Sequence, residues 1–210
     1  MATATNTAVI VQSSSQIALA DQISFRESKS PKLPGQDVYA KLAASLFETT
    51  PKRTVVAFTS VPSGAGVTHV VENLAAILIR SGKSVGICDG ALRPLRIAGL
   101  PAPVEEFGIR AGIAGNSLAP QMESAAQTVA GLRDRHDCVL LDCGSLESSA
   151  GLIRLGPLCD GVVLVAEAGK VSKAQINRAA QSVQRVQGTL LGIVLNKRQY
   201  PIPAWLYRLL

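Results

Sequence analysis

The feature that most limits the fold of this chain is a series of five short, almost uninterrupted apolar runs. They read RTVVAFTS, KSVGICDG, DCVLLDCG, DGVVLVAEAG and GTLLGIVLNK. Such runs are typical of strands buried on both faces of a parallel sheet. Helical patterns separate them, among them THVVENLAAILIRSG, which closes at Gly82, and SKAQINRAAQSVQRVQG, which ends at Gly188. The alternation predicts the α/β class, with a doubly wound, mostly parallel sheet and helices on both faces.

The chain divides into three predicted regions. Residues 1–35 are rich in Ser, Thr, Gln and Ala and end in SKSPKLPG, so we interpret them as a flexible N-terminal tail, in which AVIV is alternatively a short edge strand. The α/β domain is predicted to cover residues 36–198 and to open with an amphipathic helix in DVYAKLAASLF. Residues 199–210 form an apolar C-terminal tail, expected to pack back onto the domain; docking on a membrane partner or a lipid surface is the alternative.

Composition and charge narrow the classes of function. The 210 residues suit one domain, and no apolar stretch approaches the roughly 20 residues that cross a bilayer. Because the N-terminus lacks the pattern of a secretory signal, we expect a cytoplasmic location. The net charge of +6 is spread along the chain without aromatic interleaving, so no nucleic-acid partner is expected. The cysteines lack the paired spacing of zinc or redox sites and are expected to be buried reduced thiols: Cys88, Cys138, Cys143 and Cys159.

A candidate site can be inferred from the predicted topology, because ligands of doubly wound sheets bind beyond the carboxyl ends of the strands. One such end carries SVPSGAGVTH, which looks like the phosphate loop G-x-x-x-x-G-K-[ST], whose glycines let the backbone wrap the phosphates. Val67 stands at the position of the lysine. The alternative is an ordinary strand-to-helix turn, in which Gly64 and Gly66 only make the turn and Thr68 caps the helix.

Three of the strand ends, taken together, resemble the bacterial tyrosine kinase family. These are cytoplasmic P-loop ATPase domains that regulate capsule and exopolysaccharide assembly, and they are kin to the MinD and ParA ATPases. The resemblance runs from about Ile23 to Asn196. FTSVPSGAGVTHVVENLA resembles the family's Walker A segment and SVGICDGALRPLRIAGL its Walker A′ segment. HDCVLLDCGSLESSAGLIRLGPLCDGVVLVAEAGKVSKAQINRA resembles its Walker B strand and the segment after it.

The resemblance implies a nucleotide site at these segments. Asp89 and Asp142 take the catalytic positions, and Thr68 with Asp142 takes the position of the Mg²⁺ ligands. Asn196 resembles the residue that meets the adenine, and the sequence NKRQ lacks the final acid of a guanine-reading N-K-x-D, which favours ATP over GTP. The implied nucleotide-binding positions are Ser63, Gly64, Ala65, Gly66, Val67, Thr68, His69, Arg93 and Asn196.

Several positions depart from the family pattern. Val67 replaces the loop lysine, and Ala91 replaces the second acid of the family's D-x-D-x-R, which reads DGALR here. The Walker B aspartate is followed by CGS in place of a Pro-Pro turn. The acidic and basic residues of the family's first helix mediate ring assembly, and their counterparts here are Asp37, Ala40 and Ala43. This loss argues against the ring and leaves a homodimer through another face open.

The departures predict weak nucleotide binding and inefficient turnover. A charge-assisted hydrogen bond contributes about 1.5–3 kcal/mol, so loss of the lysine weakens the binding of ATP or ADP with Mg²⁺ by roughly ten- to a hundredfold. Removing one preorganised donor to a transition state costs about 10²- to 10³-fold in rate. We therefore expect loss of the lysine to reduce the rate of phosphoryl transfer more than the affinity for nucleotide, because the transfer depends on positioning and charge stabilisation.

Three hypotheses remain. The first is a degenerate P-loop domain that regulates or scaffolds exopolysaccharide biosynthesis by binding a membrane protein of the polysaccharide export or co-polymerase type, and that is membrane-associated through this partner. The second is an active autokinase or ATPase whose cation comes from Lys170, Lys173 or a partner chain. The third is a MinD-like or ParA-like positioning ATPase, which the absence of both loop lysines disfavours.

Overall fold

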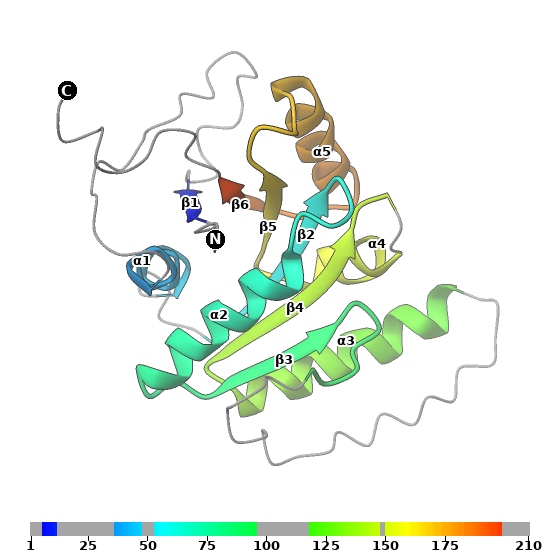
Figure 1. The fold of residues 1–210 in the computed structure, drawn as a ribbon. Helices are drawn as coiled ribbons and strands as arrows, with labels where there is room; N and C mark the ends of the chain where they lie inside the picture. Colours follow the sequence, from blue (N-terminus) through cyan, green and yellow to red (C-terminus); the bar gives the residue numbers. More distant parts are fainter. Residues whose placement is uncertain (1–5, 12–35, 48–52, 96–117, 148–149, 199–210) are drawn as a thin grey trace, which may run out of the picture.

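The computed structural model describes residues 6–11, 36–47, 53–95, 118–147 and 150–198 (Figure 1). Within these ranges six strands form one sheet in the order β1-β6-β5-β2-β4-β3. Their bounds are β1 Asn6–Val11, β2 Thr54–Val61, β3 Val85–Asp89, β4 Cys138–Ser145, β5 Gly161–Glu167 and β6 Leu190–Arg198. β2 to β6 are parallel to one another, and they coincide with the five apolar runs of the sequence. The predicted α/β class is confirmed.

Helices cover both faces of the sheet (Figure 1). Their bounds are α1 Gln36–Phe47, α2 Val67–Arg80, α3 Leu118–Arg135, α4 Gly151–Leu155 and α5 Lys173–Arg185, with a short 3-10 turn at Gly156–Leu158. Successive side chains of a strand point to opposite faces. Val56 and Phe58 of β2 therefore pack with α1 and α2, whereas Val55 and Ala57 pack with α3, α4 and α5. This is the doubly wound arrangement that the sequence predicts.

The central strand explains why the apolar runs lack polar alternation. β2 lies between β5 and β4, and each of its eight residues is buried. The carboxyl ends of β2 to β6 meet at one edge of the sheet, because these strands are parallel. At that edge Asp89 of β3 pairs in register with Asp142 of β4, and Glu167 of β5 pairs with Asn196 of β6. Polar side chains from four strands are thus gathered at one edge.

The sheet also has an antiparallel edge strand. β1 pairs with β6, with Val11 opposite Gly192, so the AVIV segment forms the edge strand that was one of two alternatives. The sheet therefore includes residues upstream of Gln36. The remainder of the predicted N-terminal tail and the predicted tail at residues 199–210 lie outside the described residues.

Two global expectations concern membranes and thiols. Among the described residues, none of the helices combines the length and the apolarity needed to cross a bilayer. All four cysteines are free thiols, and Cys88, Cys138 and Cys143 are buried, as predicted, whereas Cys159 is half-buried. Burial raises the pKa of Cys88 to about 12 and that of Cys138 to about 11, so both thiols are neutral at physiological pH.

Candidate functional site

The loop between β2 and α2 combines left-handed glycines with the start of a helix. Gly64 and Gly66 lie in the left-handed region, with φ of 81° and 93°, a conformation that glycine adopts without a Cβ penalty. Gly66 leads directly into α2, whose first turn contains no acidic residue. The first amides of a helix have no partner within the helix and carry the positive end of its dipole. This end of α2 therefore favours negative charge.

Thr68 and Asp142 come together next to this loop. The Thr68 hydroxyl, in the first turn of α2, donates to Asp142 Oδ2 over 2.6 Å. The other carboxylate oxygen, Oδ1, accepts from the amide of Gly144 at 3.0 Å, which orients the carboxylate. A hydroxyl and a carboxylate suit Mg²⁺, which prefers oxygen ligands and completes its shell with phosphate oxygens and water. The structure thus brings together the two residues that the resemblance implies for Mg²⁺.

Asp89, the neighbour of Asp142 on β3, is already engaged by its own turn. Its Oδ1 accepts from the amides of Ala91 and Arg93, both at 2.9 Å, and its Oδ2 accepts from Arg93 Nε at 2.7 Å. Burial alone would raise the pKa of Asp89, but the hydrogen bonds, led by those of Arg93, outweigh it and hold the pKa below its usual value. A carboxylate stabilised as the anion is a poor proton acceptor. This geometry favours a role for Asp89 in holding the turn rather than as a general base.

The end of β6 contacts the loop through two consecutive side chains. Asn196 is buried, and its Nδ2 donates to the carbonyl of Ala65 at 2.9 Å. The next residue, Lys197, donates from Nζ to the carbonyl of Gly64 at 2.6 Å. A Cβ on Gly66 would lie 2.5 Å from Asn196 Nδ2, so glycine is required at this close approach. Asn196 therefore binds the loop itself, and its proposed contact with adenine stays a prediction.

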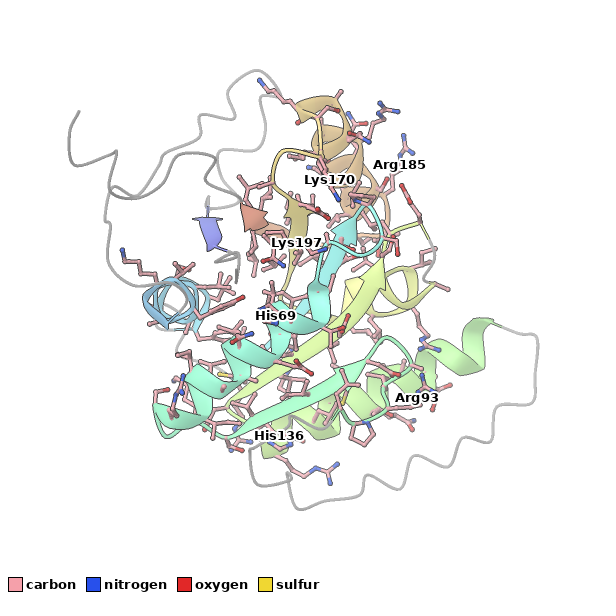
Figure 2. The ribbon with its side chains drawn as sticks, in the orientation of Figure 1. His69, Arg93, His136, Lys170, Arg185 and Lys197 are labelled. Atoms are coloured by element: carbon pink, nitrogen blue, oxygen red, sulfur yellow. The ribbon has the colours of Figure 1, made fainter. Side chains whose placement is uncertain are left out.

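Two lysines, Lys170 and Lys197 (both labelled in Figure 2), share one carboxylate. Glu167, at the end of β5, pairs with Lys170 at 2.7 Å and with Lys197 at 3.3 Å. The hydrogen bond from Lys170 is the main influence that lowers the pKa of Glu167, and the bond from Lys197 acts in the same direction. Of the two substitute lysines suggested by the sequence, Lys170 is engaged by Glu167 and Lys173 is exposed in the first turn of α5. In the described part of the chain, the ammonium that contacts the loop is that of Lys197.

Three other predicted positions take little part in this arrangement. Val67 is 6% exposed and packs in the core on the α1 and α2 face of the sheet. His69 is exposed on α2, and its ring nitrogens lie 3.3 and 3.4 Å from Asn73 Nδ2, one turn farther along the helix (Figure 2). Ser63 is exposed in the loop. The contacts of His69 are thus with its own helix and not with the Thr68 and Asp142 pair.

Lys197 is the site residue that sequence reasoning missed. Adjacent residues of a regular strand point to opposite faces, so a strand that sends Asn196 to the loop should send the next side chain away. Lys197 has a φ of 57°, in the left-handed region, and this interrupts the alternation. Both side chains consequently reach the loop. The one signal in the sequence is the direct adjacency of the two residues in NKRQ.

Known proteins resemble this chain at low sequence identity. No protein-family model matches the chain. The succinoglycan biosynthesis transport protein ExoP of Rhizobium meliloti is 21% identical over 188 residues, which are 75% of this chain but 24% of ExoP. The tyrosine-protein kinase CpsD of Streptococcus pneumoniae is 22% identical over 190 residues, which are 77% of this chain and 84% of CpsD. The match to CpsD therefore spans most of both chains.

Solved structures agree with these relatives. The kinase domain of the Escherichia coli tyrosine kinase ETK has a TM-score of 0.61 at 15% identity, covering 94% of this chain and 92% of that domain. The chain is thus similar in sequence to a bacterial tyrosine kinase and shares the fold of such a kinase domain. The kinase domain of VpsO has a TM-score of 0.55 at 18% identity, covering 77% of this chain and 96% of that domain. At these identities the structures establish the shared fold, and the sequence similarity to a named tyrosine kinase rests on CpsD.

Proposed function

We propose that the chain is a nucleotide-binding regulatory domain of exopolysaccharide or capsule biosynthesis, which binds ATP or ADP with Mg²⁺ weakly and turns ATP over inefficiently or not at all. One observation carries the proposal: the Thr68 hydroxyl donates a hydrogen bond to Asp142 beside a loop in which Gly64 and Gly66 are left-handed, while the neighbouring Val67 is buried. The chain thus keeps the residues proposed to hold Mg²⁺ and phosphate, but it lacks the lysine of the loop motif.

Binding is supported by groups that do not depend on the lost lysine. Backbone amides at a helix N-terminus bind phosphate through hydrogen bonds and through the helix dipole. The Thr68 and Asp142 pair supplies two oxygen ligands to Mg²⁺, whose charge offsets that of the phosphates. Without the ammonium group, affinity falls by roughly ten- to a hundredfold from that of a complete loop. The result is a weak site rather than no site.

Turnover is affected more strongly than binding. Phosphoryl transfer relies on cations that stabilise the transferring group, and a buried valine offers no charge at the loop. Asp89, the acid kept from the Walker A′ segment, is held by Arg93 and the turn amides, and the second acidic position is Ala91, which is exposed. The chain therefore lacks both a lysine within the loop motif and the second acid of the Walker A′ segment.

The pathway and the partner are inferred from the relatives. ExoP is named for succinoglycan biosynthesis transport, and this chain spans 24% of its length. CpsD, a tyrosine-protein kinase, is matched over 84% of its length. We propose that the domain acts on a membrane protein of the polysaccharide export or co-polymerase type, from the cytoplasmic side of the membrane.

Calorimetric titration tests the proposal. The purified chain is titrated with ADP and with ATP, each with and without Mg²⁺, alongside Val67→Lys and Thr68→Val. Val67→Met serves as the matched control, because methionine has about the length of the lysine stem without its charge. We expect measurable binding by wild type, a roughly ten- to hundredfold gain for Val67→Lys but not for Val67→Met, and loss of the Mg²⁺ dependence in Thr68→Val.

Two results would contradict the proposal. If neither wild type nor Val67→Lys binds a nucleotide, the loop is an ordinary strand-to-helix turn. If wild type releases phosphate from ATP and the rate disappears in Asp142→Ala, the chain is an active enzyme, as the second hypothesis holds. A rate that persists in Asp142→Ala instead points to a contaminating ATPase.

A further inference from the structure

We infer that Lys197 is a positioning residue, which holds the phosphate loop in its anion-receiving form and so supplies part of the affinity that a loop lysine would give. The inference rests on the proposed function, because the anion is the phosphate group of ADP or ATP. It goes further by assigning a role to a residue that lies 133 positions from Gly64 in the sequence and outside the loop motif.

The planarity of the peptide unit links Lys197 to the phosphate side of the loop. In a trans peptide the C=O and the following N–H point in opposite directions. Lys197 holds the carbonyl of Gly64, and this fixes the amide of Ala65 to point away from the Lys197 ammonium. Asn196 holds the carbonyl of Ala65, and this fixes the amide of Gly66 in the same way. Two consecutive amides are therefore oriented before any ligand arrives.

The ammonium group is itself held in place from β5. Lys197 Nζ contacts Glu167 Oε2 at 3.3 Å as well as the Gly64 carbonyl, and the Lys197 side chain is 41% exposed. The carbonyl of Asn196 accepts from the amide of Ala168 at 2.9 Å, which ties the end of β6 to the end of β5. Lys197 thus bridges a rigid strand end and the loop. Its left-handed backbone, with φ of 57°, is uncommon for a residue other than glycine, and such outliers cluster at functional sites.

Lys170 provides a control for the charge of Lys197. Both ammonium groups pair with Glu167, so removal of either one takes a positive charge from the same place. Of the two, Lys197 is the one that donates to the loop. A general attraction between phosphate and positive charge would make the two lysines equivalent. If Lys197 instead positions the loop, only the removal of Lys197 should lower the affinity for ADP.

The experiment compares wild type with Lys197→Met, Lys197→Arg and Lys170→Met. Backbone order parameters of Gly64 and Ala65 are measured by NMR in the nucleotide-free protein, and the affinity for ADP with Mg²⁺ is measured by calorimetry. Methionine keeps the apolar stem and removes the donor. Thermal midpoints of the nucleotide-free variants check that each one is folded, which is expected because Lys197 is partly exposed.

In wild type we expect order parameters near about 0.85, the value of rigid backbone, and in Lys197→Met a fall towards about 0.6. If the receiving form then makes up about a tenth of the population, the apparent affinity for ADP falls about tenfold. Lys170→Met should leave the order parameters and the ADP affinity within about twofold of wild type. Lys197→Arg keeps a donor and should recover most of the lost affinity.

The outcomes separate this inference from the proposed function. Unchanged order parameters in Lys197→Met overturn the inference even if wild type binds ADP well. An equal loss of affinity in Lys170→Met and Lys197→Met also overturns it, in favour of unspecific charge attraction. If wild type binds no ADP, the proposed function is wrong, and the order parameters of the nucleotide-free protein still decide whether Lys197 holds the loop.

Discussion

The close approach of the loop to β6 makes Gly66→Ala a sensitive test of the structure. An alanine at a φ of 93° adopts a left-handed conformation that costs about 1–2 kcal/mol. Its Cβ would also lie 2.5 Å from Asn196 Nδ2, so the buried Asn196 side chain must shift, and we expect its hydrogen bond to the carbonyl of Ala65 to break. A buried donor without a partner costs about 1–3 kcal/mol. We therefore expect a total loss of about 2–5 kcal/mol in the free energy of unfolding.

Gly64→Ala is the matched control, because Gly64 has a φ of 81° but a Cβ added there would meet no atom within 4 Å. It should lose only the conformational part, about 1–2 kcal/mol. Urea unfolding followed by circular dichroism gives both values. In an Asn196→Ala background, Gly66→Ala should lose less stability than in wild type, since the clash is gone. Equal losses for the two glycine substitutions would refute the close contact between the loop and Asn196.

Other predictions concern two carboxylates at opposite ends of the sheet, Asp160 and Asp89, and one buried thiol. Asp160→Ala removes the carboxylate that accepts from the buried amide of Val55 at 2.7 Å, and urea unfolding should show a loss of about 1–3 kcal/mol. Because the pKa of Asp89 lies below its usual value, its bonds with Arg93 stabilise the fold at neutral pH, and this contribution is lost as the pH falls through the folded pKa. The stability difference between wild type and Asp89→Asn should therefore shrink between about pH 7 and about pH 3, as measured by urea unfolding at each pH. Burial raises the pKa of Cys143, so a thiol reagent at about pH 8 should label it only after unfolding, as measured by mass spectrometry.

The sequence predicted the fold correctly at elements where the residue pattern matches the burial seen in the structure. The apolar run of β2 left no room for polar alternation, because both of its faces are covered. The start of α5 is marked by a capping box, in which Ser172 and Gln175 exchange hydrogen bonds between side chain and backbone. The sequence pattern did not indicate α3, whose buried stripe is narrow and lies among alanines and polar side chains. Its fully described buried positions are Ala125, Val129 and Leu132.

The sequence predicted those site residues whose position follows from the strand topology alone. Thr68 lies in the first turn of the helix after β2, and Asp142 lies in the second half of the parallel strand β4, so their meeting at one edge could be expected before the structure. The burial of Val67 could not be predicted, because hydrophobic periodicity does not define which way the first residue of a helix packs. The loop contact of Lys197 depends on a single left-handed residue within a strand. Backbone outliers of this kind leave no mark in hydrophobic periodicity, and they decide which side chains reach a site.

A double variant, Val67→Lys with Ala91→Asp, tests whether both departures from the family pattern limit the release of phosphate from ATP. Val67→Lys returns a cation to the loop and should tighten ATP binding, yet Ala91 still offers no carboxylate in the Walker A′ turn. Ala91 is exposed, so Ala91→Asp adds the acid without disturbing the core. We expect the double variant to release phosphate about 10²-fold or more faster than either single variant, because the transition state needs both groups. Addition of Asp142→Asn to the double variant should abolish the rate. If Val67→Lys alone matches the double variant, the missing acid is irrelevant to catalysis, and the lysine is the only obstacle to turnover.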